Sequence, residues 1–83
     1  MVSTTVTVTY FAALVDATGC RSEDLAVPDR TVAGLRAAVG QRHGPRAAAL
    51  VRLSSVLTGD EVVRHESAAI GPVVDLLPPF AGG

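Results

Sequence analysis

Two glycines, Gly82 and Gly83, end the chain and leave its terminal carboxylate on an α-carbon that carries no side chain. Such a carboxylate can be activated as a mixed anhydride and then attacked by a nucleophile, and glycine lets the backbone enter a channel too narrow for side chains. Before the glycines, an apolar run over 73–77 is followed by two prolines and then by Phe80. A frayed chain end is the plain alternative, but two prolines and an aromatic ring directly after a strand-like run favour a stiff, functional arm.

The length and composition of the chain set its size class. With 83 residues, it is large enough for one modest hydrophobic core and too small for two. Because 48% of its residues are hydrophobic and only 18% are charged, it belongs with compact proteins that fold without a metal or a disulfide. We therefore expect one domain over residues 1–77 and an extended tail over residues 78–83.

Charge and hydropathy argue against two classes of partner. The formal net charge is −1, and the seven basic residues, all of them arginines, are scattered, so the sequence offers no basic patch for nucleic acid. No apolar run approaches the ~20 residues that span a bilayer, and the N-terminal residues lack the charged and apolar segments of a secretion signal. The single cysteine, Cys20, cannot form an internal disulfide, which fits a reducing compartment. These features predict a cytoplasmic protein that binds neither nucleic acid nor membrane.

The sequence contains no self-contained active site. It has no glycine-rich phosphate loop, no serine or cysteine elbow and no metal-ligand spacing. Cys20 would need a basic partner to act as a nucleophile, and no spacing places His43 or His65 beside it. We assign Cys20 no role and expect both histidines to be structural or solvent-facing. The acidic runs at 22–24 and 60–61 have neighbours that point apart, which favours surface solvation. The sequence therefore predicts no bound metal and no bound cofactor.

The first part of the chain predicts two strands around a short helical turn. Residues 5–10 alternate strictly, with apolar side chains on one face and threonines on the other, which is typical of a half-buried strand. Residues 11–17 predict a helical turn closed by Gly19. Residues 22–27 predict a second strand, which Pro28 ends.

The middle of the chain predicts one principal helix. Thr31 suits its N-cap, and residues 32–42 carry apolar side chains at three- and four-residue spacing. The expected buried stripe consists of Val32, Leu35 and Val39. Arg36 and Arg42 are expected to point outward, and residues 46–51 to add another short helical turn after a Gly-Pro break.

The last part of the chain predicts three more strands. Residues 54–57 and 61–64 flank a turn and predict a hairpin, and residues 65–72 predict a loop. Residues 73–77 are nearly all apolar, as in an interior strand covered on both sides. Together the elements predict a two-layer α+β domain in which a mixed sheet packs against one main helix. If the first and last strands are parallel neighbours, that helix covers the crossover between them.

The tail and two internal segments match a known family. Residues 76–83, with the sequence Leu-Leu-Pro-Pro-Phe-Ala-Gly-Gly, follow a strand in a short chain and resemble the C-terminus of the MoaD family, the small subunit of molybdopterin synthase. Residues 10–13 are similar to the end of that family's first strand, and residues 31–35 to the start of its helix. The resemblance covers both ends and the middle of the chain.

This resemblance implies a β-grasp, ubiquitin-like fold and a sulfur-carrier function. The carboxylate of Gly83 would be adenylated by a MoeB-type enzyme that uses ATP, and a sulfurtransferase would supply the sulfur of a thiocarboxylate. A MoaE-type large subunit would bind the cyclic pterin precursor and hold the main active site, so this chain would be a sulfur-donor subunit without a cofactor of its own. The implied partner contacts are Leu77, Pro79, Phe80, Ala81 and Gly82.

Two departures from the family pattern lie away from the tail. Val15 stands where the family often has an arginine, and Gly-Pro-Val at 71–73 replaces a common Gly-Asp-Glu-Val lead into the last strand. They leave open which large subunit and which pathway the chain serves. Within the same class, the alternative is a carrier for thiazole or cysteine biosynthesis. Outside it, the alternatives are a ubiquitin-like protein modifier and a plain interaction module with an inert terminus.

Overall fold

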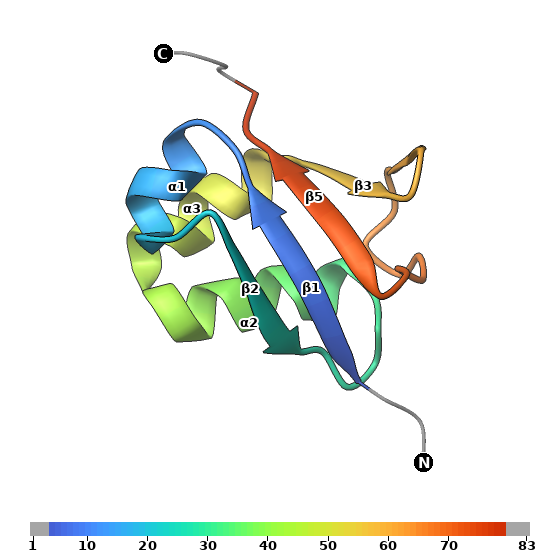
Figure 1. Cartoon of the computed structure of the whole chain (residues 1–83). Helices are drawn as coiled ribbons and strands as arrows, with labels where there is room; N and C mark the ends of the chain where they lie inside the picture. The colour runs from blue at the N-terminus through green and yellow to red at the C-terminus, as the bar shows by residue number, and fades with distance from the viewer. Residues whose placement is uncertain (1–3, 80–83) are drawn as a thin grey trace.

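One mixed five-stranded sheet, with three helices on one of its faces, makes up the domain in the computed structural model, which describes residues 4–79 (Figure 1). The elements in chain order are β1 (Thr5–Tyr10), α1 (Ala13–Thr18), β2 (Ser22–Ala26), α2 (Val32–His43), α3 (Pro45–Leu53), β3 (Ser55–Thr58), β4 (Glu61–Val63) and β5 (Val73–Leu77). The predicted two-layer α+β class is confirmed. Within residues 4–79, no helix has the length and apolar character needed to cross a membrane.

β5, the last strand, lies at the centre of the sheet, whose strand order is β2-β1-β5-β3-β4. It runs parallel to β1, with Thr7 opposite Val73 and Tyr10 opposite Leu76, and antiparallel to β3. Parallel neighbours need a long crossover connection, and α2 lies within it. The predicted parallel pairing of the first and last strands is therefore confirmed.

α2 begins where the sequence predicts. The Oγ1 of Thr31 accepts a hydrogen bond from the backbone N–H of Gly34 at 3.1 Å, which is the expected N-cap. The expected apolar stripe of α2 faces the sheet, and its three residues are fully buried: Val32, Leu35 and Val39. Gly44 follows the helix with a φ of 96°, a conformation that residues with side chains rarely adopt.

α3 is a nine-residue helix and not the short turn expected over 46–51. Pro45 occupies its first turn, where the missing N–H is not needed, and Ala47 and Val51 are buried. A Cβ added at Gly40 of α2 would lie 2.9 Å from the Cβ of Ala48, so small residues let the two helices pack closely. The helical layer therefore contains α2 and α3 packed together, rather than one main helix.

The core lies between the sheet and the helices. Alternate strand residues point into it and are buried: Val6, Val8, Tyr10, Leu25, Val56, Val74 and Leu76. The expectation that 73–77 is covered on both sides is wrong, because Val73 is 55% exposed while its neighbour Val74 is fully buried. The helices all lie on one face, so β5 is hydrogen-bonded along both edges but covered on one face only.

Arg36 also departs from the prediction, because its side chain is only 16% exposed. Its guanidinium donates hydrogen bonds to the carbonyl oxygens of Val51, Arg52 and Ser54 at the end of α3, and it pairs with Glu66 at 3.1 Å. The last carbonyls of a helix have no partner within the helix, so a cation at this position satisfies them. Arg36 thus joins α2 to the end of α3.

We expect the substitution Arg36→Ala to lower the free energy of unfolding by about 2 kcal/mol, since it removes the charged hydrogen bonds to three carbonyl oxygens and the ion pair with Glu66. Urea unfolding of the purified protein measures the change. The matched control is Arg52→Ala, which removes an exposed arginine of α3 and should change the free energy of unfolding by less than about 0.5 kcal/mol. Equal effects of the two substitutions would contradict the bridging role of Arg36.

Candidate functional site at the base of the C-terminal tail

The C-terminal tail leaves the domain from the centre of the sheet. β5 ends at Leu77, which lies opposite Ser55 at the start of β3. Pro78 follows and is buried, and it has no N–H with which to extend the ladder. Pro79 is exposed and is the last residue that the structure describes. The remaining predicted site residues lie outside the described residues: Phe80, Ala81, Gly82 and Gly83.

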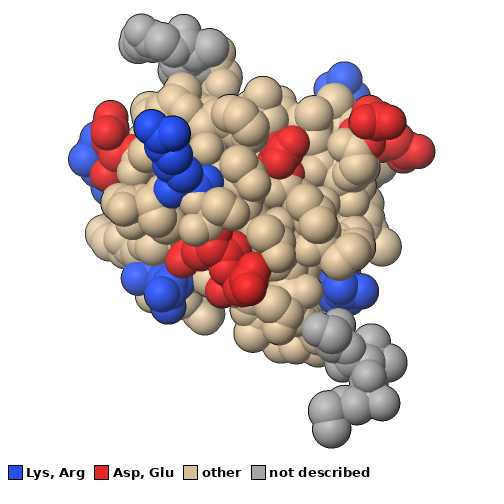
Figure 2. Space-filling view, viewed as in Figure 1, with Lys and Arg blue, Asp and Glu red and all other residues tan. Residues whose placement is uncertain are grey.

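Leu77 lies on the face of the sheet that the helices leave open. Its neighbour Leu76 points into the core and is fully buried, so the alternation of the strand turns Leu77 to the opposite face, where it is half-buried. The registers of β3 with β5 and β4 place Leu57 and Val62 on the same face. We call Leu57, Val62 and Leu77 the outer apolar patch. Figure 2 views this side of the sheet and shows most of its surface as uncharged.

A shallow hollow of about 400 Å³ lies beside the base of the tail, and it is lined by Thr9, Tyr10, Phe11, Ala12, Val15 and Arg21. Because Tyr10 lies opposite Leu76, the hollow is close to the point where β5 gives way to the tail. It includes Val15, so this departure from the family pattern alters a surface near the tail. Ala12 has a φ of 52°, which is uncommon for a residue with a side chain. The outer apolar patch and this hollow together flank the exit of the tail.

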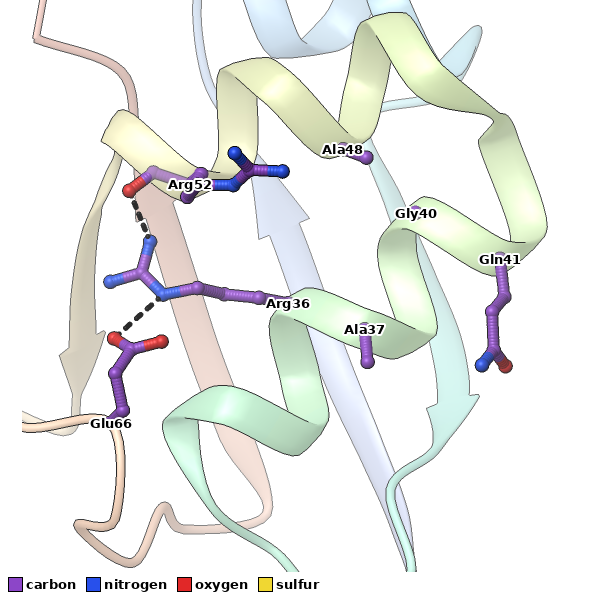
Figure 3. A pocket seen from close by; sticks show the side chains of 7 residues that line it. All are labelled: Arg36, Ala37, Gly40, Gln41, Ala48, Arg52 and Glu66. Carbon is purple, nitrogen blue, oxygen red and sulfur yellow. Dashed lines mark hydrogen bonds and ion pairs between the residues drawn. The ribbon is translucent and has the colours of Figure 1, made fainter.

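Another hollow, of about 480 Å³, lies between α2 and α3 on the helical layer (Figure 3). Arg36 and Glu66 border it and are paired with each other, and Arg36 also donates to the carbonyl of Arg52. The rest of the lining is small or neutral and consists of Ala37, Gly40, Gln41 and Ala48. None of these lining residues supplies a nucleophile or a general base that is free to react, so this hollow is not a candidate for catalysis.

Glu23 is the centre of a polar cluster at β2, and the expectation that it is solvated at the surface is wrong. Its side chain is 12% exposed. The Tyr10 hydroxyl donates a hydrogen bond to its Oε2 at 2.5 Å, and the Nε of Arg42 donates to its Oε1 at 2.7 Å. The Nε2 of His43 lies 2.5 Å from the same Oε2, and the His43 side chain is 13% exposed. The last turn of α2 thus covers Glu23.

Cys20 belongs to the same cluster. Its Sγ, a carboxylate oxygen of Glu23 and a ring nitrogen of His43 all lie within 4.8 Å of one another. The expectation that neither histidine lies beside Cys20 is therefore wrong for His43. The linear spacing carries no signal of this contact, but the order of elements does. A helix that follows a strand after a short loop runs back along it, so the end of α2 returns to the start of β2.

The hydrogen bonds of this cluster fix its charge state. Burial alone would raise the pKa of Glu23, but hydrogen bonds from Tyr10, His43 and Arg42 outweigh it and hold that pKa below its ordinary value of 4.5. Burial and then the hydrogen bond to Glu23 raise the pKa of Tyr10 well above its ordinary value of 10.0. At neutral pH, Glu23 is a carboxylate and Tyr10 a neutral phenol.

We expect Glu23→Gln to lower the free energy of unfolding by about 2 kcal/mol at neutral pH, because it removes the negative charge that pairs with Arg42 and replaces one acceptor oxygen with an NH2 group. The folded-state pKa of Glu23 is depressed, so its contribution is present above pH 4.5 and is lost as the pH falls through the folded-state pKa. The difference between wild type and variant should therefore narrow below pH 4.5 in denaturant unfolding measured across pH. The control is Asp24→Asn, on the exposed neighbour. A difference that is constant with pH would contradict this account.

Comparisons with known proteins bear on the fold and on the family. The sequence model of the ThiS family matches residues 8–83. The crystal structure of SAMP1 from Haloferax volcanii is similar, with a TM-score of 0.69 and 25% sequence identity over 95% of this chain and 99% of that chain. A crystal structure of H. volcanii small archaeal modifier protein 1 shares the fold, with a TM-score of 0.71 and 24% identity over 94% of this chain and 100% of that chain. No curated protein matches the chain. The expected β-grasp fold is confirmed, and these matches are to ThiS and SAMP1 rather than to MoaD in particular.

Proposed function

This chain belongs to the ThiS family of small ubiquitin-like proteins, and we propose on that premise that it is a sulfur carrier whose reactive group is the carboxylate of Gly83. The observation that carries the proposal is the path of the chain: β5 is held at the centre of the sheet and leads directly into the Pro-Pro-Phe-Ala-Gly-Gly tail. A base held within the sheet gives the tail a fixed starting point. The two terminal glycines suit it to enter a narrow site on another protein.

The chemistry of the carrier follows from its carboxylate. A carboxylate oxygen is a poor leaving group, so an activating enzyme would first attach AMP from ATP to the Gly83 carboxylate, with release of pyrophosphate. The persulfide of a sulfurtransferase then attacks the acyl carbon and displaces AMP, which gives an acyl disulfide. A thiol cleaves this S–S bond, so that the thiocarboxylate is released and the thiol is oxidised to a disulfide. The partner that consumes the sulfur would enclose the tail and keep water from hydrolysing the acyl group. This chain supplies the acyl group and the docking surface, and its partners supply the catalytic groups.

We place the carrier in molybdopterin synthesis, as the small subunit that a MoaE-type large subunit accepts after activation by a MoeB-type enzyme. The support for this branch is the sequence of the tail, Leu-Leu-Pro-Pro-Phe-Ala-Gly-Gly at 76–83, together with the segments at 10–13 and 31–35. In the bound state, Leu77 and Pro79 would contact the large subunit at the exit of the tail, and Phe80, Ala81 and Gly82 would lie deeper in it. Carriers for thiazole or cysteine biosynthesis are the alternatives within the same class.

Intact mass spectrometry tests the carrier function. The chain is incubated with a MoeB-type enzyme, ATP and a sulfur donor, and the expected product is heavier by the difference between one sulfur and one oxygen atom. Fragmentation should place the added mass at Gly83, and omission of ATP should abolish it. A chain whose mass never changes with active enzyme present would contradict the proposal. Restoration of molybdoenzyme activity in a cell that lacks its own small subunit then distinguishes the molybdopterin branch from the thiazole and cysteine branches.

A ubiquitin-like protein modifier is the second candidate function, and the likeness to SAMP1 favours it. The chain has no lysine, since all seven of its Lys and Arg residues are arginines, so it offers no side-chain amine for building chains of itself. As a modifier it would appear as single additions to lysines of other proteins. The last arginine of the chain is Arg64, so trypsin would leave residues 65–83 attached to a modified lysine. Cells that express a tagged chain should then yield peptides that carry this branch, and a pure sulfur carrier would yield none.

A further inference from the structure

Three potential metal ligands from separate parts of the chain meet beside β2. Cys20 lies just before β2, Glu23 lies within it and His43 is the last residue of α2. The Sγ, a carboxylate oxygen and a ring nitrogen of these residues lie within 4.8 Å of one another. We propose that Cys20, Glu23 and His43 bind a divalent cation of the zinc class, in a site separate from the C-terminal tail.

The donor set matches the coordination chemistry of zinc. Thiolate, imidazole and carboxylate ligands bind Zn²⁺ at about 2.3, 2.0 and 2.1 Å, so the three ligand atoms around one tetrahedral ion are about 3.3 to 3.6 Å apart. The three donor atoms here lie within 4.8 Å of one another, so small rotations of the side chains would bring them around one ion without a change in the backbone. Three protein ligands leave the fourth tetrahedral position for a water molecule, an arrangement that is found in zinc sites with three protein ligands and one open position.

The surroundings of the three ligands favour binding over a chance meeting of polar groups. Glu23 and His43 are 12% and 13% exposed, so few water molecules compete for these donors. The Nε of Arg42 holds the Oε1 of Glu23 at 2.7 Å, which orients the other oxygen toward His43. Tyr10 donates to that second oxygen and is able to steady the carboxylate beside an ion. The Sγ of Cys20 has only a weak contact, 3.8 Å from the Oγ1 of Thr18, and is free to turn toward a cation.

The charges of the cluster also suit a dication. A Cys20 thiolate and a Glu23 carboxylate together neutralise Zn²⁺, and Arg42 remains paired with the far oxygen of Glu23. Binding would release the thiol proton of Cys20 to solvent and would replace the contact between His43 and Glu23 with two bonds to the ion. The site would then link the last turn of α2 to β2, so the bound cation should stabilise the folded state.

Titration of the full-length protein with Co²⁺ and Zn²⁺ tests the site. A phosphine reductant keeps Cys20 reduced without adding a competing thiol. Co²⁺ should bind with one-to-one stoichiometry and show visible bands of a tetrahedral ion with a thiolate-to-cobalt charge-transfer band, and Zn²⁺ should bleach them. Cys20→Ser should remove the charge-transfer band, and both Cys20→Ser and His43→Gln should weaken Zn²⁺ binding by more than about 100-fold.

The matched controls are His65→Gln and Asp24→Asn, which remove an exposed histidine and an exposed carboxylate and should bind Zn²⁺ as the wild type does. Thermal unfolding without metal shows that each variant is folded, and added Zn²⁺ should raise the Tm of the wild type but not of Cys20→Ser. Absence of the charge-transfer band at saturating Co²⁺, or equal Zn²⁺ affinity of the wild type and Cys20→Ser, would overturn the proposal. Neither result bears on the sulfur-carrier function, which is tested separately by the change in mass at Gly83.

Discussion

Removal of Gly83 reduces formation of the thiocarboxylate by at least about 100-fold, because it draws the reactive carboxylate back by about 3.3 Å from the site where the activating enzyme holds AMP. The mass-spectrometric assay described above measures this loss as the rate at which sulfur appears at the C-terminus. β5 ends at Leu77, so the deletion leaves the sheet and its core unchanged, and the free energy of unfolding should equal that of the wild type.

A matched control for this deletion shortens the chain at its other end. A variant that lacks Ser3 also loses one residue, and it should form the thiocarboxylate at the wild-type rate. Normal sulfur transfer to the chain without Gly83 would show that the position of the terminal carboxylate is not what the activating enzyme recognises. The carrier proposal would then be wrong in its central residue.

Substitutions at two adjacent residues, Leu76 and Leu77, should affect different properties: the stability of the fold in one case and partner binding in the other. Leu77→Arg introduces a charge into the outer apolar patch beside the tail, and we expect it to weaken binding to the activating enzyme or the large subunit by about 100-fold, or about 2.7 kcal/mol. The long side chain can remain in solvent, so the free energy of unfolding should change by about 1 kcal/mol or less. Leu76→Ala instead empties a fully buried position and should cost about 3 kcal/mol of stability.

Val73→Arg is the matched control for the charge at Leu77. Val73 is also on the outer face of β5, but it lies at the opposite end of the strand from the tail. Calorimetric titration with the partner should give nearly the wild-type Kd for Val73→Arg and a weakened Kd for Leu77→Arg. If both variants lose the same amount of affinity for the partner, the partner covers the whole outer face of β5. If both variants keep the wild-type affinity, the partner contacts the tail alone.

Local patterns in the sequence were sufficient to predict most of the fold. The strict alternation at 5–10 and the spacing of Val32, Leu35 and Val39 describe which side chains face the core, and the structure confirms both. Thr31 marks the start of α2 because its hydroxyl satisfies a backbone N–H that the helix leaves free. Such signals act over a few residues, so they can be recognised without knowledge of what packs nearby.

Most of the errors concern contacts between elements distant in sequence. Arg36 was expected to point outward because its position on the helix is polar, and nothing local shows that the end of α3 lies beside it. α3 was underestimated because its alanines give little periodicity, although close packing against Gly40 stabilises it. Cys20 and His43 meet only after β2 and α2 have packed together. The predicted sites at Phe80, Ala81, Gly82 and Gly83 rest on the sequence motif and stay predictions.

The central position of β5 has a mechanical consequence for a protein that is gripped by its tail. When a force is applied to the end of β5 along the strand axis, the hydrogen bonds of β5 to β1 and β3 run across the direction of the force. The load is therefore shared by the bonds along both edges in shear, and they cannot open one after another as they would if an edge strand were peeled away. We therefore expect that partners can bind and release the C-terminal tail repeatedly without unfolding the domain.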